Sequence, residues 1–282
     1  MHVLIAVGGF PYSKKLLRFG SQILQNAGEP ATLLTVARRE SDRQLAEETL
    51  FQAREYLSDS SLEIRTLIRI GQPAEQILRE AEQGSYDLVI IGDKESHDLV
   101  SRFLLGSTAE RVVEHAPCPV IVAKGRTSPI RRILLCDSGA GSPSLTVEPV
   151  PPLLDRFIAQ HADLVEDAHE ITVLHVMSQM SAGPGVQARQ LRLGAHELIE
   201  TSSPEGRLFK QDLEALSIKD ARIKPKIRHG FVVDEIELEA REGEYDLLVI
   251  GAHRGRNFQR ILLEDIAHKI ITRIDRPILV VR

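Results

Sequence analysis

The sequence predicts an α/β protein made of two tandem copies of one doubly wound, parallel-sheet domain. Short runs of valine, isoleucine and leucine alternate with longer amphipathic stretches. That alternation is typical of strands buried in a parallel sheet between two layers of helices. The segment Tyr86–Gly92 recurs as Tyr245–Gly251 with nearly the same apolar order. A chain of 282 residues also has room for about two domains.

The duplication extends beyond that segment. Two further pairs of segments recur around it in the same order: Ile68–Gly71 with Ile227–Gly230, and Cys118–Val122 with Arg276–Val280. Their nearly constant offset indicates a repeat far longer than that of a solenoid. We therefore place the first domain at 1–124 and the second at 131–282, with a short linker at 124–130 that contains Gly125 and Pro129.

The periodicity of apolar residues predicts the elements of each copy. In the first copy we expect strands at 2–8, 31–36, 62–70, 86–92 and 119–123, and helices at 13–27, 41–58, 73–83 and 107–115. In the second we expect strands at 131–137, 170–176, 222–229, 245–251 and 277–281, and helices at 152–161, 188–200, 205–216, 232–242 and 265–274. Residues 138–152 are rich in proline, glycine and serine and are predicted to form a long loop.

Composition excludes several classes of function. A net charge of −5 disfavours a sequence-independent grip on nucleic-acid phosphates, so we expect no nucleic-acid partner. No apolar run approaches the length of a membrane helix, and the N-terminal strand has no basic region before it, so we expect no membrane partner and no signal peptide. Two cysteines, Cys118 and Cys136, do not make a disulfide framework, which suits a reducing cytoplasm.

Open parallel sheets bind ligands outside the C-terminal ends of their strands, where the strand order changes direction. We expect the first and fourth strands of each copy to end at that crevice. In the first copy this points to Gly8-Gly9-Phe10 and to the loop after Gly92. In the second copy it points to Asp137-Ser138-Gly139 and to the loop after Gly251.

The loop after Gly92 leads to Gly106-Ser107-Thr108 and then to a helix. Glycines let backbone N–H groups approach phosphates, and the N-terminus of the following helix attracts anions. With Phe103–Ser107 and His115–Val120, this loop resembles the universal stress protein family, which carries G-x-x-G-x9-G-[ST] here. The resemblance covers both copies, and it implies a Rossmann-like fold of the adenine nucleotide alpha hydrolase type and binding of ATP.

On this resemblance we assign an ATP site to the first domain only, at Gly8, Gly9, Val36, Gly92, Gly106, Ser107 and Thr108. Glu95 replaces the second glycine of the motif there, and Gly8 stands where the family usually has an aspartate. The second copy keeps Asp137, but Arg254 replaces the second glycine and Glu264-Asp265 replaces Gly-Ser. Carboxylates at a helix entry would repel phosphates, so we expect no triphosphate in the second copy.

Structural roles compete with ligand binding at several of these positions. Ser107-Thr108-Ala109-Glu110 fits a capping box, and Asp265 would be a good N-cap. In the structural alternative, Gly92 and Gly251 do no more than form the turn after a strand. The basic run of His253, Arg254, Arg256 and Arg260 is either solvated surface or an anion patch. His115 and His268 have no neighbours at metal-ligand spacing, so we expect no metal.

The sequence thus predicts a cytoplasmic, ATP-binding stress-response protein that is not an enzyme, because no nucleophile elbow, Walker loop or kinase signature appears. The alternatives are a nucleotide-free interaction or scaffold module and a slow nucleotide hydrolase. The apolar last strands, Val120–Ala123 and Ile278–Val281, are edges that need cover. We therefore expect the two copies to form an intramolecular pseudo-dimer, with a homodimer as a further assembly.

Overall fold

A computed structural model describes residues 1–10, 12–27, 30–58, 63–93, 106–137, 168–177, 194–200, 206–207, 210, 213, 222–251 and 258–281. The chain divides into two compact units. The first unit comprises Met1–Pro129 with Asp275–Val280, and the second comprises Ile130–Ile274 with Val281–Arg282. Each has its own parallel sheet, which confirms the predicted fold class.

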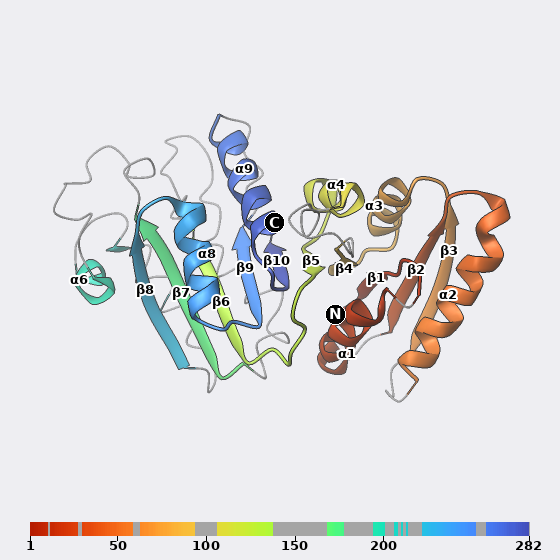
Figure 1. The fold of residues 1–282 in the computed structure, drawn as a ribbon, viewed down its shortest axis with the longest axis horizontal. Coiled ribbons are helices and arrows are strands. Elements are labelled where there is room, and N and C mark those ends of the chain that lie inside the picture. The colour runs from red at the N-terminus through yellow and green to blue at the C-terminus, as the bar shows by residue number, and fades with distance from the viewer. Residues whose placement is uncertain are drawn as a thin grey trace. The chain divides into compact units, whose positions relative to one another are not determined.

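The first unit alternates strands and helices along the chain. Its elements are β1 (Val3–Ala6), α1 (Lys14–Ala27), β2 (Ala31–Ala37), the 3-10 turn η1 (Glu40–Asp42), α2 (Arg43–Tyr56), β3 (Ile64–Ile70), α3 (Pro73–Gln83), β4 (Leu88–Gly92), α4 (Ser107–His115) and β5 (Val120–Ala123). The strands pair in parallel in the order β3-β2-β1-β4-β5. Helices α1 and α2 cover one face of the sheet, and α3 and α4 cover the other (Figure 1).

The layers follow from the positions of the apolar residues in each strand and helix. Strand β1 buries Val3, Leu4 and Ile5 completely, because a central parallel strand is covered on both sides. Helix α1 buries Leu17 and Phe19 against the sheet and leaves its charged residues in solvent. Pro73 opens α3, where its missing N–H would have no helical partner in any case.

A further strand completes the sheet of the first unit. Strand β10 (Ile278–Val281) pairs antiparallel with β5, with Leu279 opposite Ile121 and Val280 opposite Val120. All four residues of β5 are buried, and so are all four of β10. The apolar edge that the sequence predicts for β5 is therefore covered, and by the strand that the sequence analysis assigns to the end of the second copy.

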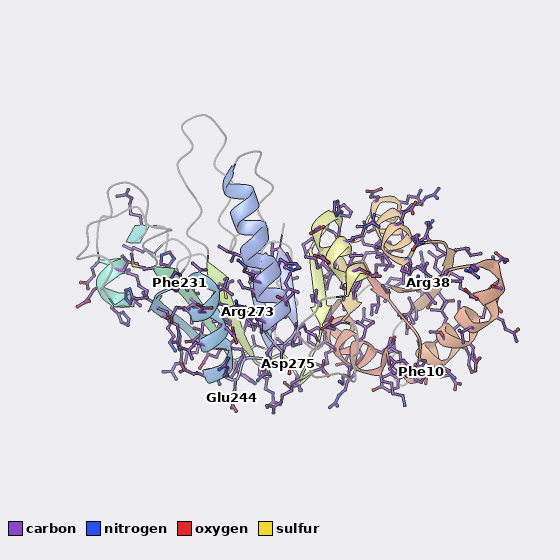
Figure 2. The ribbon with its side chains drawn as sticks, turned by 45° about the horizontal axis from the view of Figure 1, so that its top comes forward. Phe10, Arg38, Phe231, Glu244, Arg273 and Asp275 are labelled. Carbon is purple, nitrogen blue, oxygen red and sulfur yellow. The ribbon has the colours of Figure 1, made fainter. Side chains whose placement is uncertain are left out.

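The second unit repeats the pattern. Its elements are β6 (Arg132–Asp137), β7 (Glu170–Met177), α6 (Ala195–Ile199), β8 (Arg222–His229), α8 (Val232–Glu242), β9 (Leu247–Gly251) and α9 (Phe258–Arg273). The strands pair in parallel in the order β9-β6-β7-β8. Helix α8 lies across this sheet and contacts β7 and α9 (Figure 1). Phe231, at its N-terminus, is exposed at the surface of the unit (Figure 2).

The described elements agree with most of the predicted ones. The predicted helix at 152–161 and the loop at 138–152 lie outside the described residues, as do 188–193 and most of 205–216. Of the predicted helix at 188–200, the structure describes α6 over Ala195–Ile199. No helix within the described residues is long and apolar enough to cross a membrane.

The repeated Tyr-Asp segments have the same structural role in both units. The Tyr86 hydroxyl donates to Glu80 Oε1 at 3.0 Å, and the Tyr245 hydroxyl donates to Glu239 Oε1 at 2.7 Å. The second oxygen of each glutamate accepts from an arginine of the preceding strand, Arg69 or Arg228. Each network ties a helix to the strand before it and to the segment that leads into the next strand, so the repeat in this segment is explained by packing.

A glycine precedes each of these tyrosines because the ring lies against the backbone. A Cβ on Gly84 would lie 2.2 Å from the Tyr86 ring, and one on Gly243 would lie 2.0 Å from the Tyr245 ring. Both distances are shorter than any real contact of a Cβ atom. The glycines are therefore required by close approach of the ring.

Candidate functional site

The C-terminal edge of the first unit brings together the strand ends that the sequence singles out. Ala6 at the end of β1 pairs with Leu34 of β2 and with Ile91 of β4. Gly8, Val36 and Gly92 follow these positions, so they lie at the same edge of the sheet. The edge is held by Thr35, whose buried hydroxyl donates to the Val7 carbonyl at 3.1 Å. Strands β1 and β4, the first and fourth strands that we expect to end at the crevice, pair with each other in parallel.

Three glycines at this edge are not required by the packing of the protein. A Cβ on Gly9 would meet nothing within 4 Å, and one on Gly8 would meet only the Ser13 hydroxyl, at 3.8 Å. A Cβ on Gly92 would touch Leu16 at 3.9 Å, which is ordinary van der Waals contact. None of the three has a positive φ. The turn after a strand therefore does not explain Gly92, and the backbone at Gly9 adjoins open space.

Helix α4 begins at the position predicted for the end of the glycine loop. Gly106 is its N-cap, with φ −63° and ψ 140°, and Ser107 and Thr108 are its first two residues. The capping-box interpretation is wrong, because the N-cap position belongs to a glycine that has no side chain with which to cap. The backbone N–H groups of the first turn are thus presented by a helix start without a side-chain cap at its N-cap residue, as an anion site requires.

Lys124, which the sequence analysis did not single out, lies at the same edge directly after β5. Only 6% of its surface is exposed. Burial lowers the pKa of its ammonium group, while the nearby Asp93 and Asp275 act in the opposite direction. Asp93 follows Gly92, and its backbone N–H donates to the Ala123 carbonyl at 3.4 Å. A lysine after an apolar strand is typical of a solvated strand end, so no sequence signal reveals its burial.

The corresponding region of the second unit is built differently. We expected its last helix to begin at 265, but α9 begins at Phe258. Glu264 and Asp265 therefore lie inside a helix, and the predicted N-cap at Asp265 is wrong. The helix extends because residues 258–263 contain no glycine or proline and include good helix formers such as glutamine, arginine and leucine.

Among the remaining features that the sequence predicts, the structure describes Asp137 but not most of the basic run. Residues 252–257, with most of the basic run, lie outside the described residues, as does the first-unit loop at 94–105 with Glu95. Asp137 ends β6, opposite His175 of β7. Within the described part of the chain, no group of three or more His, Cys, Asp or Glu residues could hold a metal ion.

Comparison with known proteins identifies relatives of both halves. The model of the Universal stress protein family matches residues 1–124 and 154–282. A universal stress protein of Methanothermobacter thermautotrophicus is 38% identical over 60 residues, which are 21% of this chain and 40% of the relative. One of Methanocaldococcus jannaschii is 37% identical over 78 residues, which are 28% of this chain and 45% of the relative. The chain thus spans less than half the length of these curated relatives.

Two solved structures resemble the whole chain. A universal stress protein from Archaeoglobus fulgidus matches with a TM-score of 0.67 and 16% identity, over 99% of this chain and 96% of its own. A putative universal stress protein from Pseudomonas aeruginosa matches with a TM-score of 0.66 and 14% identity, over 99% of this chain and 92% of its own. At these identities the likeness shows that the fold is shared.

Proposed function

Because the chain belongs to the universal stress protein family, we propose that its first unit binds an adenine nucleotide, ATP, at the C-terminal edge of its sheet. The observation that carries this proposal is the start of α4, where Gly106 is the N-cap and Ser107 opens the helix. This start lies at the end of the loop that leaves β4, on the edge where Gly9 adjoins open space. A crevice of this kind is where open parallel sheets bind nucleotides.

Each residue of the site has a distinct task in this proposal. The backbone N–H groups of Ser107 and Thr108 hold phosphate oxygens, and the dipole of α4 favours their negative charge. Gly92 and Gly106 leave room for the backbone to come close to those oxygens. Gly8, Gly9 and Val36 receive the nucleoside at the ends of β1 and β2. Lys124 is a buried cation at the same edge and balances part of the phosphate charge.

The second unit does not bind a triphosphate in this manner. Its last helix starts at Phe258, so the connection from Gly251 is shorter than the connection from Gly92 to Ser107. The helix also begins without a Gly-Ser pair. We propose binding of one nucleotide per chain, in a stress-response role in the cytoplasm and without catalysis.

Two measurements on the full chain test the proposal. Mass spectrometry after denaturation of the purified protein should release ATP, and calorimetric titration with ATP, ADP and AMP should give one site per chain. Absence of co-purified nucleotide together with no binding in the titration would favour a nucleotide-free interaction module. Two equivalent sites per chain would refute the distinction between the units, and turnover of ATP to ADP would refute the absence of catalysis.

Substitutions locate the site. Gly106→Glu places a carboxylate and a side chain at the start of α4 and should abolish ATP binding. Gly9→Val fills open space without a backbone conformation that forbids a side chain, so the protein should fold normally and bind ATP at least about tenfold more weakly. Gly194→Val is the matched control, because a Cβ there meets only Glu197, at 3.7 Å, in the second unit. Unchanged ATP affinity in both site variants would rule out this site.

A further inference from the structure

A basic pocket lies in the first unit outside the proposed nucleotide site. Its volume is about 530 Å³, and four cationic side chains line it: Lys14, Lys15, Arg18 and Arg126. The rest of the lining includes Tyr56 at the end of α2 and hydroxyl residues such as Ser128. No residue that we assign to the nucleotide site lines this pocket. Its volume lies in the range of small-molecule sites.

The charged residues among the described lining of this pocket are all cationic. None of the described lining residues is an aspartate or glutamate, although the chain as a whole has a net charge of −5. Other arginines within the described residues, among them Arg69, Arg132 and Arg228, are paired with glutamates. By contrast, no carboxylate of the described residues is ion-paired with Arg18 or Arg126. Arg18 and Arg126 therefore bring to the pocket positive charge that no carboxylate of the described residues neutralises.

The stability of α1 does not explain these cations. Lys14 and Lys15 are its first two residues, Arg18 lies one turn further on, and the first turn has no acidic residue. Cations at a helix N-terminus face the positive end of its dipole, an arrangement that disfavours the helix. Lys14 is also held in place, because its ammonium lies 5.2 Å from the centre of the Phe10 ring, and Phe10 lies beside α1 (Figure 2). A ligand of opposite charge would offset the repulsion.

We propose that this pocket binds a small anion with several phosphate groups, as an inorganic oligophosphate or as the phosphate chain of a nucleotide. Arginine guanidinium groups donate in pairs to phosphate oxygens, and the lysine ammonium groups add point charges. The exposed ring of Tyr56 gives the pocket a surface on which a base could stack if the source is a nucleotide. The inference does not depend on ATP binding at the strand edge.

Titration of the full chain with sodium tripolyphosphate tests this inference. The wild type should bind one equivalent, more weakly as salt rises, because exposed charges are screened. The double variant Arg18→Glu with Arg126→Glu should lose about a hundredfold in affinity, at about tenfold for each lost charged contact. Arg79→Glu, an exposed arginine on α3 with the same change of charge, should bind as the wild type does. Circular dichroism should show the same helix content in all variants.

Two further arms separate the sources of phosphate and the two sites. If ADP and ATP bind with the same dependence on Arg18 as tripolyphosphate, the source is a nucleotide. If only tripolyphosphate binds in this way, the source is an inorganic chain. Gly106→Glu should leave tripolyphosphate binding intact, even where it abolishes ATP binding. The inference is overturned if tripolyphosphate does not bind, if the double variant binds it as tightly as the wild type, or if Arg79→Glu weakens it equally.

Discussion

Replacing Tyr245 with phenylalanine should destabilise the second unit by about 2 kcal/mol. Glu239 is 1% exposed, and its Oε2 accepts from Lys226 Nζ and Arg228 Nε, both at 2.6 Å. Its Oε1 accepts from the Tyr245 hydroxyl at 2.7 Å. The variant keeps the ring and removes only this donor. A hydrogen bond to a charged group contributes about 1.5–3 kcal/mol, and water has little access to replace it here.

The duplicated network supplies an internal comparison. Tyr86→Phe makes the same change in the first unit, where Glu80 is 8% exposed and the hydroxyl lies 3.0 Å from Oε1. Water reaches that carboxylate more easily, so we expect a smaller loss, about 1 kcal/mol. Tyr12→Phe is the control, because Tyr12 is 59% exposed and its substitution should change stability by less than about 0.5 kcal/mol.

The assay must report on each unit separately, because a chain of two units need not unfold in one step. Urea denaturation followed by circular dichroism gives the overall curve, and hydrogen exchange of peptides from α3 and α8 assigns each transition to its unit. The reasoning is refuted if Tyr245→Phe behaves as Tyr12→Phe does, or if Tyr86→Phe is the more damaging of the two network variants.

Three further predictions concern the same fold. Gly243→Ala should destabilise the second unit by about 1–3 kcal/mol in urea denaturation, because its Cβ would lie 2.0 Å from the Tyr245 ring, and adding Tyr245→Ala should relieve much of that overlap. Burial raises the pKa of Glu239, but hydrogen bonds from Lys226, Tyr245 and Arg228 outweigh it and hold that pKa below its usual value. Its stabilisation is therefore complete above pH about 4.5 and is lost as pH falls through the lower folded pKa, so stability curves of Glu239→Gln should be flatter in this acidic window. Deleting 275–282 uncovers the buried edge of β5, and sedimentation analysis should then show more self-association than the full chain shows; a truncated chain that associates no more than the full chain would contradict this.

The strands could be predicted from sequence because they are runs of apolar residues whose burial needs no knowledge of distant partners. Every predicted strand is present within the described residues. The start of α9 could not be placed, because the family motif suggested a helix entry at Glu264-Asp265 while local helix propensity extends the helix back to Phe258. The capping box required Ser107 at the N-cap of α4, but the N-cap is the residue before it, Gly106. This shift of one residue rules out the capping box and leaves the first turn of the helix without a side-chain cap.

Part of the candidate site depends on contacts between residues far apart in the chain. Lys124 lies near Asp93 and Asp275, whose charges act on its pKa against the effect of burial, and the basic pocket joins α1 to residues that follow β5. No local sequence pattern indicates contacts between residues so far apart in the chain. The duplicated glutamate–tyrosine networks are intermediate, because the repeat is visible in the sequence while the reason for it, a buried hydrogen bond, is visible only in the fold.

The position of β10 also bears on how the protein is made. A domain usually folds as a unit while the rest of the chain is still being synthesised. Here the strand that covers β5 follows α9, so the ribosome must produce all the elements from β6 to α9 before the first sheet can close. During that interval the edge of Val120–Ala123 is available to other nascent chains. We expect the first unit to acquire its protease resistance only after release of residues 275–280, which makes translation speed and chaperone access relevant to its yield.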